Sequence, residues 1–328
     1  MKMPRTILVY VHEDLLGDGI LKLPFARALR EMFPQAHITW WAGGGKSFYA
    51  GGLKPLVRGL IDHVMEQHLE SRMKELVRPS PLKHKFFDLI IDTQRDLFPT
   101  LALKKIPHGV FVSRTAGFLF SAFKPTSKMK PQDGHLSSQL IFLLEIIKKE
   151  RIKKPDLLPD SGVVKPYEKP FQKYFKANES YVGFAPGAGN RKKCWPLENF
   201  IEVAHFVVKQ GKKPVFILGP AETDWHGRLK EEFPQALFPL QDLPDVMKDP
   251  LYTAALGFFL KGALVNDSGI AHLLILSGVR LVSLFGNTKV EKVRPLSPHL
   301  TVVKASDFKG ERVSDIPPEA ITQILKNI

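Results

Sequence analysis

The chain has 328 residues, of which 44% are hydrophobic and 24% are charged. This balance is typical of a globular protein and excludes a wholly disordered chain, which lacks the apolar surface that offsets conformational entropy. A disulfide scaffold is excluded as well, because Cys194 is the only cysteine. No uncharged apolar run reaches the ~18 residues of a membrane-spanning helix, and the first residues lack the pattern of a signal peptide, so we expect neither.

The net charge of +14 is unevenly distributed along the chain. Residues 1–165 hold 26 basic and 16 acidic side chains, a surplus of +10, whereas the rest hold 21 and 17, a surplus of +4. The asymmetry indicates that the first half faces something anionic: nucleic acid, a membrane surface or a phosphorylated substrate. A surface tuned for solubility is the alternative, and charge alone leaves it open.

Strand and helix patterns alternate in the first half. Short apolar runs predict buried strands at residues 6–10, 37–41, 86–92 and 108–112. Apolar residues at helical spacing predict helices over residues 19–33 and 135–149. Pro24 lies inside the first of these helices, where it must either kink the helix or mark the start of its longer part.

Residues 153–170 contain four prolines and several lysines, and they are the best candidate for a linker. Beyond them the alternation resumes. Strands are predicted at residues 181–185, 214–218, 263–266 and 281–285, and helices at 197–209, 270–276 and 317–328. Two alternating halves joined by a proline-rich linker predict an α/β chain with two doubly wound parallel-sheet domains.

Residues that follow the predicted strands are candidates for the site, because ligands of doubly wound sheets bind beyond the carboxyl ends of the strands. The segment Leu16-Gly17-Asp18-Gly19 follows the first strand. Asp18 can cap the next helix by accepting hydrogen bonds from its free amides, or it can act as a general base toward a substrate hydroxyl. The residues alone favour the cap.

Two loops of the second half also carry candidates. Gly187 lies in a glycine-rich turn that precedes Lys192 and Lys193. Free amides and ammonium groups at such a turn form an anion cradle, although a tight turn with surface lysines has the same sequence. Glu222 follows the next strand, where it can accept hydrogen bonds from a ribose or an amide, or be an ordinary surface carboxylate.

Asp267, Ser268 and Gly269 connect a predicted strand to a helix. Asp267 and Ser268 are natural helix caps, and Gly269 leaves the amides accessible. His272 lies four residues after Ser268, on the same helix face. A histidine on an apolar helix is usually a satisfied core residue, but this one lies one turn from a helix start suited to phosphate, which raises the weight of a functional role.

In this order and at these spacings, the motifs resemble glycosyltransferase family 9, the family of the lipopolysaccharide heptosyltransferases, over nearly the whole chain. The matching segments are 7–9, 16–18, 23–24, 28–29, 33–34, 38–40, 88–92 with Gln94, 186–188 with Lys193, Trp195 and Pro196, 267–269 with His272, and 284–286 with Thr288. Two positions depart from the family's pattern. Ser268 stands where threonine is usual, and Leu15 stands where small polar residues are common.

The resemblance implies a GT-B architecture, in which two Rossmann-like doubly wound domains have a cleft between them. It also implies an inverting transfer of heptose from ADP-L-glycero-D-manno-heptose to the growing lipopolysaccharide core, with no required metal and no cofactor. By motif, Asp18 is expected to be the catalytic base, Lys193 to contact the donor phosphate and Glu222 to lie near the adenosine. The full set of expected donor-binding residues is Gly187, Lys193, Glu222, Asp267, Ser268, Gly269 and His272.

The resemblance also assigns domains and partners. Residues 1–165 are expected to bind the acceptor, residues 166–315 to bind the nucleotide sugar, and residues 316–328 to form a helix that can pack back on the first domain. A phosphorylated core acceptor at an anionic membrane suits the basic first half and implies a cytoplasmic protein, peripheral on the inner face of the inner membrane. A non-catalytic nucleotide-binding descendant stays open as an alternative. No nucleic-acid partner is expected, because helix-turn-helix, zinc and RNA-recognition motifs are missing from the sequence.

Overall fold

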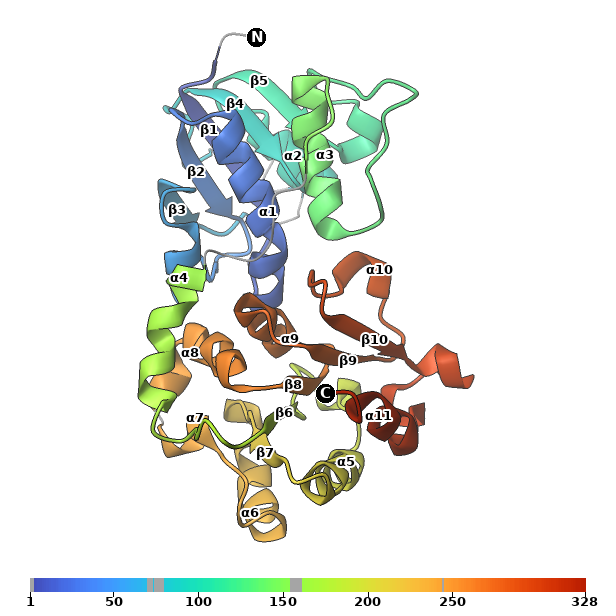
Figure 1. The fold of residues 1–328 in the computed structure, drawn as a ribbon. Helices are drawn as coiled ribbons and strands as arrows, with labels where there is room; N and C mark the ends of the chain where they lie inside the picture. Colours follow the sequence, from blue (N-terminus) through green and yellow to red (C-terminus); the bar gives the residue numbers. More distant parts are fainter. Residues whose placement is uncertain (1–2, 70–72, 74–79, 154–160, 244) are drawn as a thin grey trace. The chain divides into compact units, whose positions relative to one another are not determined.

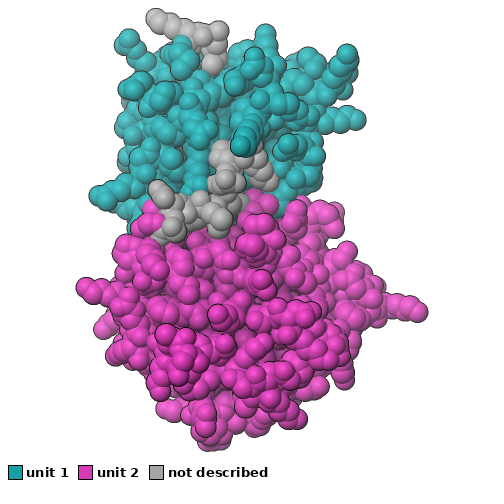
Figure 2. Space-filling view, in the orientation of Figure 1, with its two compact units in different colours: residues 1–156 teal, residues 157–328 magenta. Residues whose placement is uncertain are grey.

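The computed structural model describes residues 3–69, 73, 80–153, 161–243 and 245–328. The chain divides into two compact units, residues 1–156 and 157–328 (Figure 2). Each unit holds one five-stranded parallel sheet with helices packed on it (Figure 1). The predicted α/β class with two doubly wound parallel sheets is therefore confirmed.

The sheet of the first unit has the order β3-β2-β1-β4-β5, and all neighbouring strands pair in parallel. Its strands are β1 (Thr6–Val11), β2 (His37–Ala42), β3 (His63–Glu66), β4 (Phe87–Asp92) and β5 (His108–Ser113). Apolar runs predict every one of these strands except β3. As an edge strand, β3 buries none of its residues fully, so it has no apolar run that the sequence could reveal.

The described helices of the first unit are α1 (Leu16–Met32), α2 (Leu97–Leu103) and α3 (Leu136–Lys148), with 3-10 turns η1 (Lys54–Val57) and η3 (Thr115–Phe118). α1 and α3 lie side by side on one face of the sheet (Figure 1). α1 begins at Leu16 and continues through Pro24, so this proline does not mark the start of the helix.

The sheet of the second unit has the order β10-β9-β8-β6-β7, again with parallel neighbours. Its strands are β6 (Tyr181–Ala185), β7 (Lys213–Phe216), β8 (Gly262–Asn266), β9 (Leu281–Phe285) and β10 (Leu300–Lys304). The helices are α4 (Ser161–Val164), α5 (Leu197–Lys209), α6 (Thr223–Glu232), α7 (Pro239–Asp242), α8 (Pro250–Leu256), α9 (Gly269–Leu274), α10 (Val290–Val293) and α11 (Pro318–Leu325). The 3-10 turns are η4 (Lys165–Phe171), η5 (Arg191–Lys193), η6 (Pro220–Glu222), η7 (Val246–Lys248), η8 (Gly257–Phe259), η9 (Ile275–Ser277), η10 (Ala305–Phe308) and η11 (Val313–Asp315).

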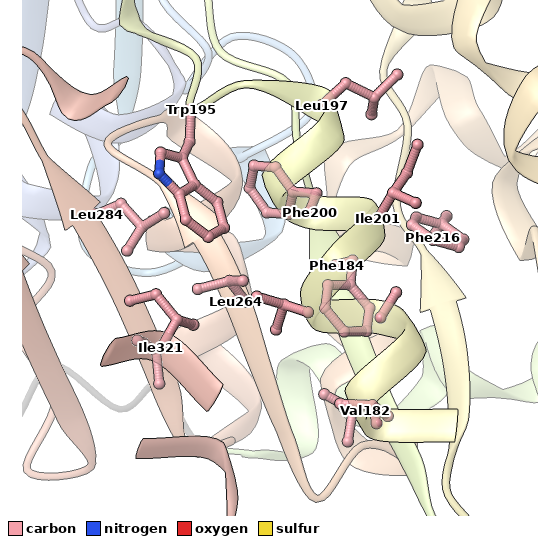
Figure 3. Packing of buried hydrophobic residues seen from close by; sticks show 14 of the residues in the cluster. Val182, Phe184, Trp195, Leu197, Phe200, Ile201, Phe216, Leu264, Leu284 and Ile321 are labelled. Atoms are coloured by element: carbon pink, nitrogen blue, oxygen red, sulfur yellow. The ribbon is translucent and has the colours of Figure 1, made fainter. Parts of the chain in front are cut away.

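Alternate side chains of β6 enter different cores, because both faces of this parallel sheet are covered. Val182 and Phe184 lie in the core that also holds the Trp195 ring and residues of α5 and α11 (Figure 3). Tyr181 and Ala185 lie in the opposite core, with residues of α8 and α9. Burial on both faces explains why the strands read as continuous apolar runs.

The division into compact units and the packing of the last helix describe how the second half of the chain is built. The chain divides between residues 156 and 157, and α4 and η4 belong to the second unit because they contact α8. Residues 154–160 of the predicted linker lie outside the described residues. α11 packs on α5, with Ile321 and Leu325 buried in the core of the second unit. That residues 316–328 can also pack on the first domain stays a prediction.

Candidate active site

Asp18, the expected base, lies in the first turn of α1, directly beyond the carboxyl end of β1. The N-cap residue of this helix is Leu15, and no side chain caps the helix there. The Asp18 side chain is partly exposed, and it forms no hydrogen bond or ion pair with any residue that the structure describes. The capping role is therefore not observed, and the carboxylate is available to a ligand.

A buried ion pair fixes the loop that leads into α1. Lys22 Nζ lies 2.6 Å from Asp14 Oδ1, and the two side chains are only 7% and 0% exposed. Asp14 Oδ2 accepts two more hydrogen bonds, from Trp40 Nε1 at 2.6 Å and from Ser47 Oγ at 2.8 Å. Lys22 Nζ also donates to the backbone oxygen of Glu13. Two buried charges are tolerated here because each has the other and further hydrogen bonds.

The loop after β2 holds the start of α1 from a second direction. The Tyr49 hydroxyl donates a hydrogen bond of 2.5 Å to the carbonyl oxygen of Gly19. The Phe48 amide donates one of 3.1 Å to the carbonyl oxygen of Asp14. Because Asp14 and Gly19 lie on either side of Asp18 in the sequence, these bonds hold the Asp18 backbone in place at the edge of the sheet.

The end of β4 carries a second buried carboxyl group. Asp92 is 0% exposed and accepts hydrogen bonds from the hydroxyls of Thr100 at 2.5 Å and Ser113 at 2.8 Å, and from the backbone N–H of Gln94 at 2.9 Å. Burial raises the pKa of Asp92 to about 6. The group joins the residues after β4 to α2 and β5, a structural role that its place in the sequence does not reveal.

In the second unit, the predicted donor residues gather beyond the carboxyl ends of β6, β7 and β8, which are neighbours in the sheet. Asn266, the last residue of β8, joins this edge to the loop after β6. Its Oδ1 accepts a hydrogen bond of 3.0 Å from the Trp195 amide, and its Nδ2 donates one of 2.6 Å to the Pro186 carbonyl. Asn266 was not predicted as a site residue, yet it fixes the loop that carries Gly187 and Lys193 at both ends.

Gly187 and Glu222 belong to different loops but lie in contact. A Cβ at position 187 would lie 2.3 Å from the carboxyl carbon of Glu222, so any larger residue must displace the Glu222 side chain. Glu222 is 4% exposed, and one of its oxygens accepts a hydrogen bond of 3.0 Å from the Gly219 amide. Burial raises the pKa of the Glu222 carboxyl group. Glu222 is therefore not an ordinary surface carboxylate but part of the packed edge.

Two cations of the loop after β6 differ in their surroundings. Lys193 is exposed, and its ammonium group has no ion-pair partner within the described part of the chain. Arg191 donates hydrogen bonds of 2.6 Å to the Ala221 carbonyl and to Asp224, and its guanidinium lies 4.0 Å from the centre of the Trp225 ring. Arg191 therefore holds the loop against the start of α6, while Lys193 is free to meet an anion.

The segment from Asp267 to Gly269 connects β8 to α9, as predicted. Ser268 is the N-cap residue of α9, but its hydroxyl does not cap the helix. Its oxygen is buried and has no hydrogen-bond partner among the residues described. A buried hydroxyl without a partner is costly, and a ligand oxygen at this position would remove the cost. His272 is 5% exposed, so little of its ring is accessible to a ligand.

The two edges offer complementary chemistry. The first unit presents a carboxylate that can accept a proton. The second presents an ammonium group and backbone amides that can stabilise a departing anion. In the described ranges, no group of three or more His, Cys, Asp or Glu side chains is arranged to hold a metal ion. No helix among these residues is both long and apolar enough to cross a membrane.

Three solved structures share the fold of this chain over nearly its whole length. The glycosyl transferase family 9 protein from Veillonella parvula is 20% identical, with a TM-score of 0.72 over 100% of this chain and 98% of that one. E. coli heptosyltransferase WaaC, solved with ADP, is 18% identical, with a TM-score of 0.67 over 98% of this chain and 99% of that one. E. coli ADP-heptose lipopolysaccharide heptosyltransferase II is 17% identical, with a TM-score of 0.66 over 98% of each chain.

The two parallel five-stranded sheets with their helices define a protein of the GT-B class. Within this class, the model of glycosyltransferase family 9 (heptosyltransferase) matches residues 80–315. The chain belongs to this family. A comparison with curated proteins gave no match.

Proposed function

We propose that this protein is an inverting glycosyltransferase that moves a heptose from ADP-heptose to a phosphorylated lipopolysaccharide core acceptor. The observation that carries the proposal is the state of Asp18, a partly exposed carboxylate in the first turn of α1 without a partner among the described residues. Asp18 also holds the position of the base in the family motif. A carboxylate that the fold does not use is suited to take a proton from an acceptor hydroxyl.

In the proposed reaction, the acceptor hydroxyl oxygen attacks the anomeric carbon of the donor sugar. Asp18 takes the hydroxyl proton as the new carbon–oxygen bond forms. The bond between the anomeric carbon and the diphosphate breaks, and its electron pair leaves with ADP. Because attack comes from the face opposite the leaving group, the anomeric configuration is inverted.

The loops after β6, β7 and β8 of the second unit, here called the donor edge, are assigned the task of stabilising the negative charge that develops on the diphosphate. Lys193 supplies an exposed ammonium group without an ion-pair partner among the described residues. The amides of Ser268 and Gly269, at the start of α9, and the buried Ser268 hydroxyl supply neutral donors. In this proposal, these groups stabilise the leaving diphosphate without a metal ion. The crystal structure of WaaC with ADP supports an adenosine diphosphate donor.

The acceptor is assigned to the first unit (residues 1–156), which makes up most of the basic half of the chain: residues 1–165 hold 26 basic and 16 acidic side chains, a surplus of +10. Each basic side chain near an anionic membrane contributes ~1 kcal/mol of binding free energy. This charge supports a phosphorylated acceptor that is anchored in lipid, and a cytoplasmic protein working peripherally at the inner face of the inner membrane.

A release assay tests the proposal. ADP-heptose, UDP-glucose and GDP-mannose are supplied separately with delipidated core acceptors, and the free nucleoside diphosphate is measured. We expect release of ADP from ADP-heptose only, dependent on the acceptor and unchanged by EDTA. Binding of ADP without turnover would identify a non-catalytic nucleotide-binding descendant instead. Loss of turnover in EDTA that magnesium or manganese restores would contradict the metal-free mechanism and make Asp267 a candidate ligand.

A further inference from the structure

Two arginines of the first unit meet at one neutral oxygen atom. Arg95 follows the end of β4, and Arg114 follows the end of β5, its neighbour in the sheet. Arg95 Nη2 lies 3.3 Å from Gln139 Oε1, and Arg114 Nη1 lies 3.0 Å from the same atom and 3.3 Å from the Gln139 backbone oxygen. The Gln139 amide nitrogen donates a hydrogen bond of 2.6 Å to the Gly134 carbonyl, which turns its oxygen toward the arginines.

The two positive charges are held together without an ion-pair partner among the described residues. Neither arginine forms an ion pair within the part of the chain that the structure describes. Asp96, next to Arg95 in the sequence, accepts a hydrogen bond from the Phe98 amide and caps α2. Arg114 is partly buried, and burial together with the nearby charge of Arg95 lowers its pKa to about 10. The folded protein thus keeps two guanidinium groups together at a free-energy cost that an anion would remove.

The arginine pair lies at the same edge of the sheet as Asp18. β1, β4 and β5 are parallel, so the segments that follow them emerge at one edge. Gln139 is in the first turns of α3, and α3 packs beside α1, whose first turn holds Asp18. An anion bound by the arginines would therefore belong to a molecule at the edge that carries the proposed base.

We propose that Arg95 and Arg114 form a binding site for an oxyanion of the acceptor, a phosphate or carboxylate group carried by a sugar. A guanidinium group binds such an oxyanion through two parallel hydrogen bonds. The side-chain oxygen of Gln139, which both arginines share, cannot offer this contact to either of them. The assignment of the anion to the acceptor rests on the proposed function, whereas the anion site itself does not.

Thermal unfolding of the full chain with added anions tests the site, because a ligand that binds only the folded state raises Tm. Mannose 6-phosphate and glucuronate present a phosphate and a carboxylate, so the two arms separate the two sources. The variants are Arg95→Gln and Arg114→Gln. Lys105→Gln is the matched control, because Lys105 is an exposed cation on the same unit that contacts neither arginine.

We expect at least one of the two sugars to raise the Tm of the parent and of Lys105→Gln equally. In Arg95→Gln and Arg114→Gln, the apparent Kd for that sugar should rise at least tenfold. The Tm of Arg95→Gln without ligand should not fall, because the repulsion is relieved; a merely structural arginine would lower it. If Arg114→Lys loses affinity for the sugar, but less than Arg114→Gln does, both the charge and the planar guanidinium geometry contribute to binding.

Two results would overturn the site: no shift in the parent with either sugar, or the same shift in the parent and in both arginine variants. Titration with ADP separates this failure from that of the proposed function. If the parent and the variants bind ADP with equal affinity while no variant alters the response to the sugars, the donor assignment stands and the anion site is wrong.

Discussion

The Lys22 ammonium lies 2.6 Å from the Asp14 carboxylate, and this buried pair is anchored in the loop and helix that carry Asp18. Asp14 is also bonded to Trp40 and Ser47, so one carboxylate joins the start of α1 to β2 and to the loop after it. The segment that carries the proposed base is therefore held by buried hydrogen bonds and an ion pair, and their contribution to stability can be tested apart from the chemistry.

The first prediction concerns this pair. Lys22→Met should lower the free energy of unfolding by ~3–5 kcal/mol, because it leaves the Asp14 carboxylate buried without its cation. Asp14→Asn in the same chain should recover much of the loss, because a neutral amide no longer needs the cation and can keep the bonds from Trp40 and Ser47. Urea unfolding of both single variants and of the double variant measures the coupling. Strictly additive losses would show that the ion pair contributes no coupling energy.

The second prediction concerns the donor edge. Gly187→Ala should weaken ADP binding, because the added Cβ would lie 2.3 Å from Glu222 and must displace its side chain. Gly189→Ala is the matched control, since a Cβ at that position meets nothing within 4 Å. Titration calorimetry with ADP should show a loss of tenfold or more for the first variant, or at least ~1.4 kcal/mol, and little change for the second. Equal affinities for both variants would remove Gly187 from the donor site.

The third prediction concerns Lys193. Lys193→Ala should weaken ADP binding, because its ammonium group is exposed and without an ion-pair partner within the described residues. Lys209→Ala serves as the control, since Lys209 is also exposed but lies at the far end of α5. The effect of Lys193→Ala should shrink as salt is raised, since screening weakens an exposed charge. Equal, small losses for the two variants would make Lys193 an ordinary surface lysine.

The fourth prediction concerns pH. Asp92 has its pKa raised from 3.8 to about 6 in the folded chain, so between these values the folded state binds more protons than the unfolded state. The stability contributed by this group is therefore present below pH ~4 and is lost as pH rises to ~6, a loss of about 3 kcal/mol at most. Asp92→Asn cannot titrate. The unfolding free energy of this variant relative to the parent should rise between pH 4 and 6 and level off above, whereas a constant difference would contradict the raised pKa.

The sequence predicts the central strands because each is buried on both faces, as in Val182 and Phe184 against Tyr181 and Ala185. It does not predict β10, which lies at a sheet edge and buries only Val303 fully. It also misses α6, a polar helix in which only Leu229 is fully buried. Such elements need little apolar sequence, so periodicity cannot find them.

The candidate site divides in the same way. The sequence predicts where Asp18 and Gly187 lie, because each directly follows an apolar run that is recognisable as a strand. Arg95 and Arg114 could not be predicted as a pair, because Gln139 lies 44 and 25 residues away from them in the sequence. Asn266 was missed because its two bonds reach across 71 and 80 residues. Contacts of this range exist only once both loops are placed by the fold.

The turnover of Asp18→Asn tests the central claim most directly. The amide keeps the size and shape of the side chain but cannot take a proton, so the rate of ADP release from ADP-heptose with acceptor should fall by ~10²–10⁴-fold. The unfolding free energy and the affinity for ADP should stay at the parent values, since Asp18 bonds no described residue and lies outside the donor edge. Turnover within a few-fold of the parent would contradict the account and leave Asp18 without a role as the base.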